Sequence, residues 1–238
     1  MIAYKTASSD NHKKVLVTLK IPKDALTNIN RDDIKDKRYA KYRCNKATVV
    51  SIEDEEGNSY NSASTNIYKK KSIEYVVGKE VVEKDYCKNI DVVCGEGIHF
   101  FLDKEVAIMY GSHYKENGEF KRWFGNGQLY KQYSISNGKF NGEYKEWLEN
   151  GIINELCNYK EGELDGEYKT FHLNGKVFEH YNYKKGFLDG KTEIFDSKGN
   201  KCLISTYKNG KLDGKYQTWD GKRNLVKDEM YVNGEKIN

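Results

Sequence analysis

The chain has 238 residues, with 40 Lys and Arg against 36 Asp and Glu, and its formal net charge is +4. So small an excess of positive charge on so charged a chain favours a solvated surface of mixed charge and argues against a nucleic-acid partner. Tyrosine is abundant (19 residues), proline occurs once and 37% of the residues are hydrophobic, which is typical of a polar β-protein with a thin aromatic core.

The sequence has no apolar run of the ~18 residues that a membrane-spanning helix needs, and its start does not resemble a secretory leader. The five cysteines are odd in number and widely spaced, as is usual for free thiols in a reducing compartment. We therefore expect a cytoplasmic protein.

The first 112 residues show no repeat, and their β-branched stretches predict a domain that is mainly β. Alternating apolar residues predict strands at residues 15–21 and 47–52. Residues 72–77 and 80–82, separated by a Gly-Lys dipeptide, are expected to form a further short pair of strands.

The segment 94–101, Cys-Gly-Glu-Gly-Ile-His-Phe-Phe, is the most distinctive feature of this domain. Its two glycines lead into a short apolar strand, and Asp103 follows as the N-cap of a short helix that carries Tyr110. Tyr4, His99 and Tyr110 are the candidates for a pocket here.

Several short motifs make residues 1–112 similar to an uncharacterised domain that precedes MORN-type or pentapeptide repeats in giant-virus and some bacterial proteins. The motifs are Tyr4-Lys5, Thr18-Leu-Lys-Ile-Pro22, Arg43-Cys-Asn-Lys-Ala47 and the segment that ends in Ile98-His-Phe-Phe101. That family has no established activity, so the resemblance implies only an adaptor domain fused to a repeat scaffold. A viral origin would place the protein in the host cytoplasm or the virion.

An enzymatic alternative rests on the same segment. Gly97-Ile-His-Phe-Phe101, followed by a helix that ends at Tyr110, resembles the Gly-Ile-Tyr-Phe segment of ADP-ribosyltransferases, where an aromatic side chain packs against nicotinamide. The resemblance implies that His99 would take that position and that NAD would be the ligand. The other interpretation is a buried strand whose histidine is hydrogen-bonded. Because the sequence has no P-loop, HExxH or nucleophile-elbow motif, we expect no enzyme activity and no cofactor.

Cys44, Cys87, Cys94 and His99 are of the residue types that bind zinc. The spacing of Cys87 and Cys94 does not fit a Cys-x-x-Cys knuckle, so we expect structural thiols and no metal site.

From residue 118 onward, glycines recur at a fixed step, and Gly118 and Gly142 are 24 residues apart. Three series keep this step: Gly118, Gly142, Gly166, Gly190 and Gly214; Gly127, Gly151, Gly175 and Gly199; Gly138, Gly162, Gly186, Gly210 and Gly234. A fixed period of ~20–50 residues indicates a repeat architecture.

Each unit begins Gly-x-aromatic-x-x-aromatic in most copies, and the first three units then have an Asn-Gly dipeptide, which supplies the positive φ angles of a tight hairpin. We expect one β-hairpin per unit, with neighbours paired edge to edge into a sheet roughly 48 Å long. The predicted fold is thus mainly β: a β-rich (α+β) domain of unknown function at residues 1–114, then an elongated single-layer antiparallel sheet of five 24-residue hairpin repeats at residues 115–238.

The Gly-x-Tyr-x-x-Trp start and the glycine spacing make residues 117–237 similar to the MORN-variant repeat. Thr192 in place of the first aromatic and Arg223 in place of the middle glycine depart from the pattern, so the last unit is irregular, as capping repeats are. The resemblance implies an elongated curved sheet that serves as a scaffold for proteins or, in some members, for membrane lipids.

The aromatic residues of the repeats are the strongest candidates for a binding face. They are Trp123, Tyr144, Trp147, Tyr168, Phe171, Phe195, Tyr216 and Trp219. The two aromatics of a unit are three residues apart, which places them on opposite sides of a regular strand. The column that contains the tryptophans is either the thin core of the sheet itself or a groove that accepts a partner helix or strand.

We expect a protein partner on the repeats, and hence a non-enzymatic scaffold. Because an open array of hairpins leaves an unpaired edge, a homodimer through the last hairpin, residues 214–237, is a second expectation. Lys121, Lys145 and Lys169 align at one offset, which makes phosphoinositide or membrane-surface binding a lesser alternative, since Glu193 and Gln217 interrupt the stripe.

Overall fold

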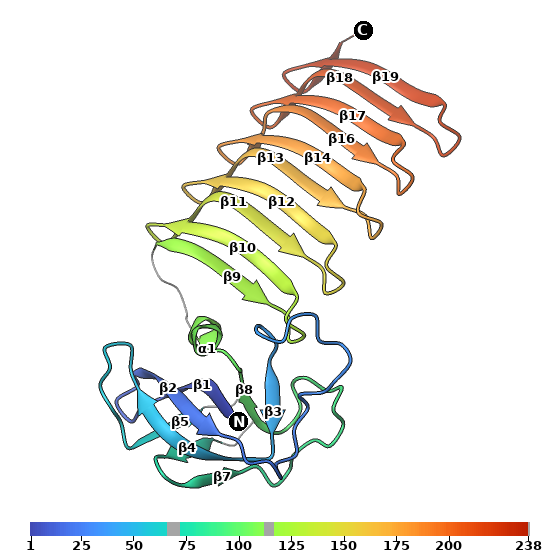
Figure 1. The fold of residues 1–238 in the computed structure, drawn as a ribbon. Coiled ribbons are helices and arrows are strands. Elements are labelled where there is room, and N and C mark those ends of the chain that lie inside the picture. Colours follow the sequence, from blue (N-terminus) through green and yellow to red (C-terminus); the bar gives the residue numbers. More distant parts are fainter. Residues whose placement is uncertain (66–71, 112–116, 238) are drawn as a thin grey trace. The chain divides into compact units, whose positions relative to one another are not determined.

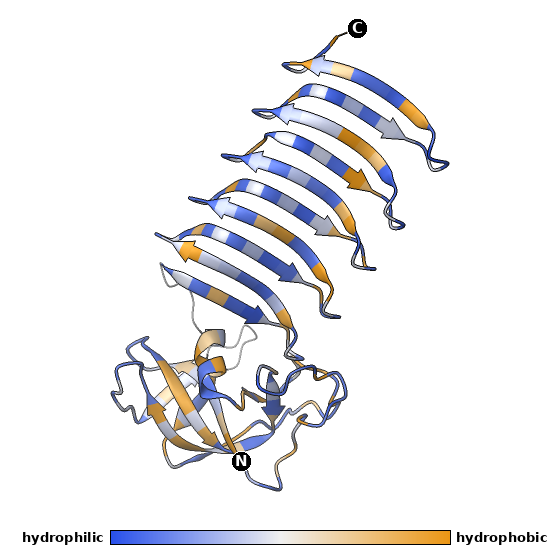
Figure 2. Ribbon diagram, turned by 45° about the horizontal axis from the view of Figure 1, so that its top comes forward, coloured by the Kyte–Doolittle hydropathy of each residue, from blue (hydrophilic) through white to orange (hydrophobic). Residues whose placement is uncertain are grey.

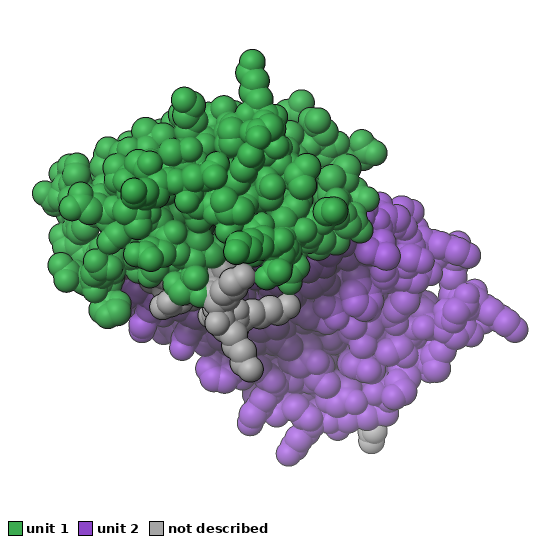
Figure 3. All heavy atoms as spheres, turned by 90° about the horizontal axis from the view of Figure 1, so that it is seen from below, with its two compact units in different colours: residues 1–113, 122–128 green, residues 114–121, 129–238 purple. Residues whose placement is uncertain are grey.

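The structure is a computed structural model that describes residues 1–65, 72–111 and 117–237. Its contacts divide the chain into two compact units: unit 1 comprises residues 1–113 and 122–128, and unit 2 comprises residues 114–121 and 129–238 (Figure 3). No helix in the described ranges is long and apolar enough to cross a membrane.

Unit 1 is built on a six-stranded sheet with the strand order β6-β5-β1-β2-β4-β7 (Figure 1). A separate two-stranded sheet pairs β3 (Tyr42–Cys44) with β8 (Ile98–Phe100), and α1 (Lys104–Gly111) is the helix of this unit. The strands of the larger sheet are β1 (Ile2–Ser8), β2 (Lys14–Lys20), β4 (Lys46–Glu53), β5 (Ser62–Thr65), β6 (Ile73–Val76) and β7 (Glu80–Val82).

Strand β2 shows why this sheet forms where the sequence predicts it. Val15, Val17 and Leu19 point to one face and are buried in the main core of the unit. Leu16, on the opposite face, is buried in a second cluster with Phe101 and residues of α1. Since both faces of β2 are covered, apolar residues follow one another directly at Val15, Leu16 and Val17, and unit 1 is rich in hydrophobic strand residues (Figure 2).

The short helix lies where the sequence predicts it. Asp103 precedes α1, and its carboxylate Oδ1 accepts a hydrogen bond from the backbone N–H of Val106 (3.1 Å), as an N-cap does. The expected pairing of the strands near residues 72–82 is wrong, however. Strand β6 pairs with β5 and β7 pairs with β4, so the two lie at opposite edges of the sheet.

The repeats form a single 12-stranded antiparallel sheet in which strands follow one another in sequence order, and this confirms the predicted mainly β fold (Figure 1). Hydrophobic residues recur along these strands between hydrophilic ones (Figure 2). The strands are β9 (Gly118–Trp123), β10 (Leu129–Ser136), β11 (Lys139–Trp147), β12 (Ile153–Lys160), β13 (Glu163–Phe171), β14 (Val177–Lys184), β15 (Phe187–Leu188), β16 (Gly190–Phe195), β17 (Lys201–Lys208), β18 (Lys211–Trp219), β19 (Leu225–Val232) and β20 (Glu235–Ile237).

The strands end along two sides of this sheet, called here its long edges, and the turns on these two sides differ. On one edge, two-residue turns join paired strands, and both turn residues have positive φ, as in Glu161 (φ 53°) and Gly162 (φ 90°). These are the tight hairpin turns that twisted strands favour. On the other edge, Leu148 N donates to Ile152 O and only Gly151 has positive φ, so Asn150 does not adopt the expected conformation. Its side-chain oxygen instead accepts a hydrogen bond from Ile152 N (3.0 Å).

The first glycine series lies within the strands and faces tyrosines. Gly166, for example, pairs with Tyr183 and has a φ of +108°, a conformation that other residues rarely adopt. The same pairing recurs for Gly142 with Tyr159, Gly190 with Tyr207 and Gly214 with Tyr231.

Successive repeats are also linked by side chains. Asp165 accepts a hydrogen bond through its Oδ2 from the backbone N–H of Lys185 in the next tight turn (3.2 Å). Asp189 and Asp213 do the same for Asn209 and Asn233. The recurrent Leu-Asp-Gly segment thus fixes each tight turn against the one before it.

Candidate functional site

The repeat sheet has two chemically different faces. Directly paired residues of adjacent strands share a face, so Tyr144, Cys157, Tyr168 and Tyr181 lie in one row across β11 to β14. We call the face that carries this row the tyrosine face. It also carries Tyr133, Tyr159 and Tyr183, which pair with residues of that row or lie two residues from it along a strand. On β16 to β19 the row continues through Thr192, Ser205, Tyr216 and Glu229, with Tyr207 and Tyr231 two residues from it.

The rings of the tyrosine face touch one another. The rings of Tyr168 and Tyr181 are nearly parallel, with centroids 6.0 Å apart and 9° between their planes. Tyr183 meets both of them edge-on, at 5.9 Å and 6.4 Å. Burial raises the pKa of the Tyr144 phenol to about 12, as expected for a ring that is 8% exposed.

A second row of side chains runs parallel to the tyrosines and is partly acidic. It consists of directly paired residues from β10 to β14: Lys131, Glu146, Glu155, Thr170 and Glu179. Beyond β14 the row continues with Ile194 and Leu203. We call these residues the acidic row. Tyrosine hydroxyls donate to its carboxylates, as Tyr144 does to Glu146 and Tyr181 does to Glu179 (both 2.9 Å).

The opposite face carries paired charges and is called here the tryptophan face. Strand alternation places Trp147, Phe171, Phe195 and Trp219 on it, all half-buried. Lys145 pairs with Glu143 and Lys169 pairs with Glu167, both at 2.6 Å. Of the three aligned lysines, Lys145 and Lys169 thus lie next to carboxylates, so most of the stripe is not a free basic surface.

The structure separates the aromatic residues that the sequence nominated for binding. Tyr144, Tyr168 and Tyr216 lie on the tyrosine face, whereas the second aromatics of the later repeats lie on the tryptophan face: Trp147, Phe171, Phe195 and Trp219. Trp123 belongs to unit 1, where its indole stacks on Tyr39. The replacement of an aromatic by Thr192 interrupts the tyrosine face: Thr192 is buried and its hydroxyl lies 2.5 Å from that of Ser205.

The pocket candidates of unit 1, Tyr4, His99 and Tyr110, are all partly buried. Tyr4 and Tyr110 pack against the cluster around Phe101, and the Tyr110 hydroxyl donates to the carbonyl of Trp123 (2.6 Å). His99 lies on β8 with its Nε2 3.3 Å from the carbonyl of Val93, so this nitrogen carries the proton if the contact is a hydrogen bond. Burial lowers the pKa of His99 to about 4.

The nominated zinc ligands do not gather around a metal position within the described ranges, which hold no group of three or more His, Cys, Asp or Glu side chains suited to one. Cys44 is buried, and its Sγ lies 3.8 Å from the carbonyl of Ile98. Burial raises the pKa of this thiol to about 12.

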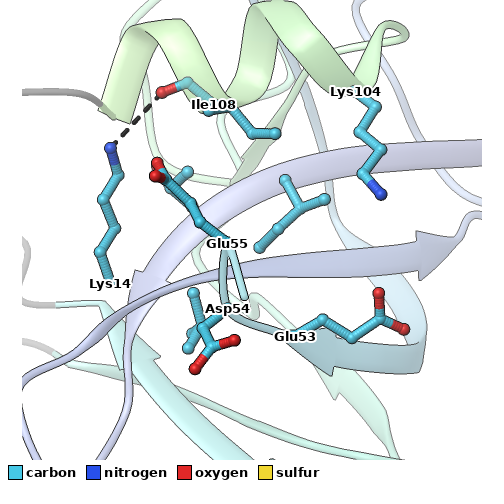
Figure 4. A pocket seen from close by; sticks show the side chains of 9 residues that line it. Lys14, Glu53, Asp54, Glu55, Lys104 and Ile108 are labelled. Atoms are coloured by element: carbon cyan, nitrogen blue, oxygen red, sulfur yellow. Dashed lines mark hydrogen bonds between the residues drawn. The ribbon is translucent and has the colours of Figure 1, made fainter. Parts of the chain in front are cut away.

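A small pocket of unit 1 lies beneath α1 (Figure 4). Its floor is apolar and its rim is charged, with Lys14 donating through Nζ to the carbonyl of Ile108 (3.4 Å) beside Glu55 (Figure 4). The cavity volume is about 40 Å³. A drug-sized ligand needs roughly 300 Å³ or more, so this pocket is not a small-molecule site.

The acidic row was not identified from the sequence, nor were Tyr133 and Tyr181 of the tyrosine face. Lys131, Glu155, Glu179, Leu203 and Lys227 occupy the same position in successive repeats. These residues share the 24-residue spacing, but their charge changes from copy to copy, so the series is not recognised as part of the repeat from the sequence alone. Tyr133 and Tyr181 were missed for the same reason, because Cys157 and Ser205 alternate with them.

A β-rich domain joined to a single-layer sheet of 24-residue hairpins defines a hairpin-repeat protein with an appended domain. Comparison with family models identifies both parts. Residues 1–107 match a family of unknown function (DUF5758), and residues 116–137, 140–161 and 164–185 match the MORN repeat variant. The chain therefore contains a DUF5758 domain followed by MORN-variant repeats, which confirms the resemblance drawn from the motifs. No curated protein matches the chain.

Proposed function

We propose that this protein is a non-enzymatic interaction module whose repeat sheet binds a partner protein on its tyrosine face. MORN-variant repeats are consistent with a protein- or membrane-interaction module. The observation that carries the proposal is the tyrosine face, where Tyr168, Tyr181 and Tyr183 are half-buried and their rings contact one another across neighbouring strands. The described strands of unit 2 form one sheet, so no second layer of this unit covers these rings. Tyrosine combines a large apolar ring with a hydroxyl and is enriched at protein interfaces.

A protein partner is favoured over an anionic membrane by the charges. The lysines that could bind lipid head groups, Lys145 and Lys169, are each paired with a glutamate on their own strand. The tyrosine face carries the acidic row, which would repel anionic lipids. Membrane binding stays the lesser alternative.

The proposal also covers location and catalysis. The five cysteines are free, which supports a reducing, cytoplasmic environment. We propose that unit 1 is an adaptor and not an ADP-ribosyltransferase, since His99 is partly buried and its Nε2 lies 3.3 Å from the carbonyl oxygen of Val93. Titration calorimetry with NAD tests this: no heat of binding is expected, and a saturable heat would favour the enzyme.

A second copy of the chain is a further candidate partner at the last hairpin. Strand β19 pairs with β20 only at Met230, Tyr231 and Val232. Leu225 and Val226 of β19 are 48% and 62% exposed, which favours an additional strand along this edge. Light scattering at high protein concentration tests the dimer, and a monomeric mass would exclude it.

Photo-crosslinking tests the main proposal directly. p-Benzoylphenylalanine in place of Tyr181 samples the tyrosine face, and the same residue in place of the adjacent His180 samples the tryptophan face. We expect one defined protein to crosslink at position 181 of the full chain and not at position 180. Crosslinking of that protein at position 180 alone, or equally at both, would refute the assignment of the face.

A further inference from the structure

We propose that the tyrosine face binds a cationic segment of its partner, with arginine or lysine side chains held between Glu155 and Glu179 against the rings of Tyr168 and Tyr181. This inference rests on the proposed function and names the chemistry of the partner at the same face. It comes from a comparison of equivalent positions in successive repeats.

The first repeat shows how this face holds a cation of its own. Lys131 is paired with Glu146, with Nζ and Oε2 2.8 Å apart, and its Nζ lies 5.5 Å from the ring centroid of Tyr144. A carboxylate and an aromatic ring together thus accommodate one ammonium group. At the far end of the sheet, Lys227 occupies the equivalent position, with its Nζ 6.0 Å from the ring centroid of Tyr216.

In the middle repeats, carboxylates take the position of the cation and Thr170 takes that of Glu146, so negative charge lies beside the tyrosine rings without a cation of the row. Glu155 and Glu179 stand at the position of Lys131, and neither forms an ion pair with any residue of the described chain. Their contacts are with neutral donors: Cys157 for Glu155, and Thr170 and Tyr181 for Glu179. Tyr168 and Tyr181 supply the rings.

The charges around Glu155 also favour a cationic partner. Burial raises the pKa of Glu155, and the neighbouring charge of Glu146 raises it further. Lys131 is ion-paired with Glu146, and its weaker attraction for Glu155 does not offset the effects of burial and of Glu146. A cation from a partner would relieve this repulsion, and an arginine would also stack on the rings.

The distance between the two glutamates sets the register of the partner. Thr170 pairs with Glu155 on one side and with Glu179 on the other, so the carboxylates are two strands apart. Two strand spacings are roughly 10 Å. Two cationic side chains three residues apart on a polyproline II segment that crosses the strands would point to the same side and would be roughly 9 Å apart, since this helix has three residues per turn and rises ~3.1 Å per residue.

The overall charge of the chain makes the test informative. Because the net charge is +4, a cationic peptide is not attracted to the protein as a whole, and its binding must depend on a local acidic surface. The probe is a fluorescent peptide of repeated Arg-Gly-Ser units, compared with Gln-Gly-Ser and Glu-Gly-Ser peptides of the same length. Fluorescence anisotropy with the full chain measures the affinity.

We expect the arginine peptide to bind, and to bind more weakly as salt is added, while the glutamate peptide does not. Glu155→Gln with Glu179→Gln should lower the affinity for the arginine peptide about tenfold. The matched control is Glu143→Gln with Glu167→Gln, which removes the same charge from the tryptophan face and should leave the affinity unchanged.

Three outcomes would overturn the inference: no binding of the arginine peptide, equal binding of the glutamine peptide, or equal losses in the two double variants. The salt dependence and the peptide comparison use the unaltered protein, so they hold even if a variant fails to fold. If peptide binding fails while the partner still crosslinks at position 181, the interaction face stands and only its preference for cations is wrong.

Discussion

The ring of Tyr39 lies parallel to the indole of Trp123, with centroids 4.3 Å apart and 6° between the planes. Trp123 occupies the second aromatic position of the first repeat, but here it is part of unit 1. The turn that follows it is held by the same unit, since Lys35 N donates to Asn126 O (2.8 Å) and Lys41 N to Gly125 O (3.0 Å). Unit 1 therefore includes a piece of chain from the repeat region.

The stack predicts an energetic coupling between Tyr39 and Trp123. In urea unfolding of unit 1, Tyr39→Leu and Trp123→Leu should each destabilise, and the double variant should destabilise by less than the sum. A coupling free energy of about 1 kcal/mol is expected for a stacked pair. Additive losses would show that the rings do not stack in solution. Trp219→Leu, with the same substitution in the last repeat, is the control and should show no coupling to Tyr39→Leu.

The buried lysine of β1 predicts a stability that rises with pH. Lys5 points into the core of unit 1, where its Nζ is 2.6 Å from the Tyr75 hydroxyl, and burial, with a contribution from Lys41, lowers its pKa to about 7. The unfolded state, with a pKa near 10.5, binds more protons between about pH 7 and 10.5, so this group favours folding increasingly across that window. Below about pH 7 Lys5 is protonated in both states, so its burial destabilises the folded state to the full extent.

Lys5→Met should therefore stabilise the protein at pH 7, on the order of a few kcal/mol, and should flatten the rise of stability between about pH 7 and 10.5. Thermal unfolding across that range measures both effects. Lys20→Met, at an exposed position of the neighbouring strand, is the control. An unchanged pH profile in Lys5→Met would mean that the ammonium reaches solvent.

His99 predicts a loss of stability in acid. Its pKa of about 4 in the folded state lies below the ordinary value of 6.5, chiefly because of burial and then because of the nearby Lys41. The neutral imidazole of His99 contributes fully to the stability of the folded state above about pH 6.5. This contribution is lost as the pH falls toward 4, because the unfolded state takes up the proton first. His99→Gln should remove on the order of 1–3 kcal/mol of this acid sensitivity, as measured by denaturant unfolding at several pH values. An identical slope in the variant would contradict the assignment.

Gly166 predicts a cost that comes from the backbone alone. An added Cβ would meet Asn158 only at ordinary contact distance (3.6 Å), but the φ of +108° is unfavourable for alanine. Gly166→Ala should destabilise the repeat sheet by about 1–3 kcal/mol. Gly221→Ala, where the space is open and φ lies outside the positive range, should change stability by less than about 0.5 kcal/mol in the same unfolding assay.

The sequence determined the repeat sheet well because one physical signal recurs many times. The glycine period located every hairpin, and Asp103 and the alternation in residues 15–21 located a helix start and a strand. The assignment of turn types was less successful, since Asn-Gly favours a tight turn locally whereas strand register selected the longer loop at Asn150.

What could not be predicted depends on contacts between distant residues. Strands β6 and β7 are adjacent in sequence but pair with β5 and β4, because β5 lies beside β1 and β4 lies beside β2, on either side of the central strands of the sheet. The acidic row becomes visible only when residues from five strands are placed side by side. Trp123 lies 24 residues before Trp147, so its spacing groups it with the repeat aromatics. Its stacking on Tyr39 and its place in unit 1 depend on tertiary contacts that the spacing does not reveal.

The hydrogen bond from Lys185 N to Asp165 joins a turn to the turn before it, and Asp189 and Asp213 continue the series. A gene that gained or lost one whole 24-residue unit would restore every such bond with its new neighbour. A gain or loss of any other length would leave an aspartate facing the wrong backbone group and a glycine without its tyrosine. The length of the repeat region can therefore evolve in whole units, and the number of strands can be adjusted to the length of a partner without redesign of the fold.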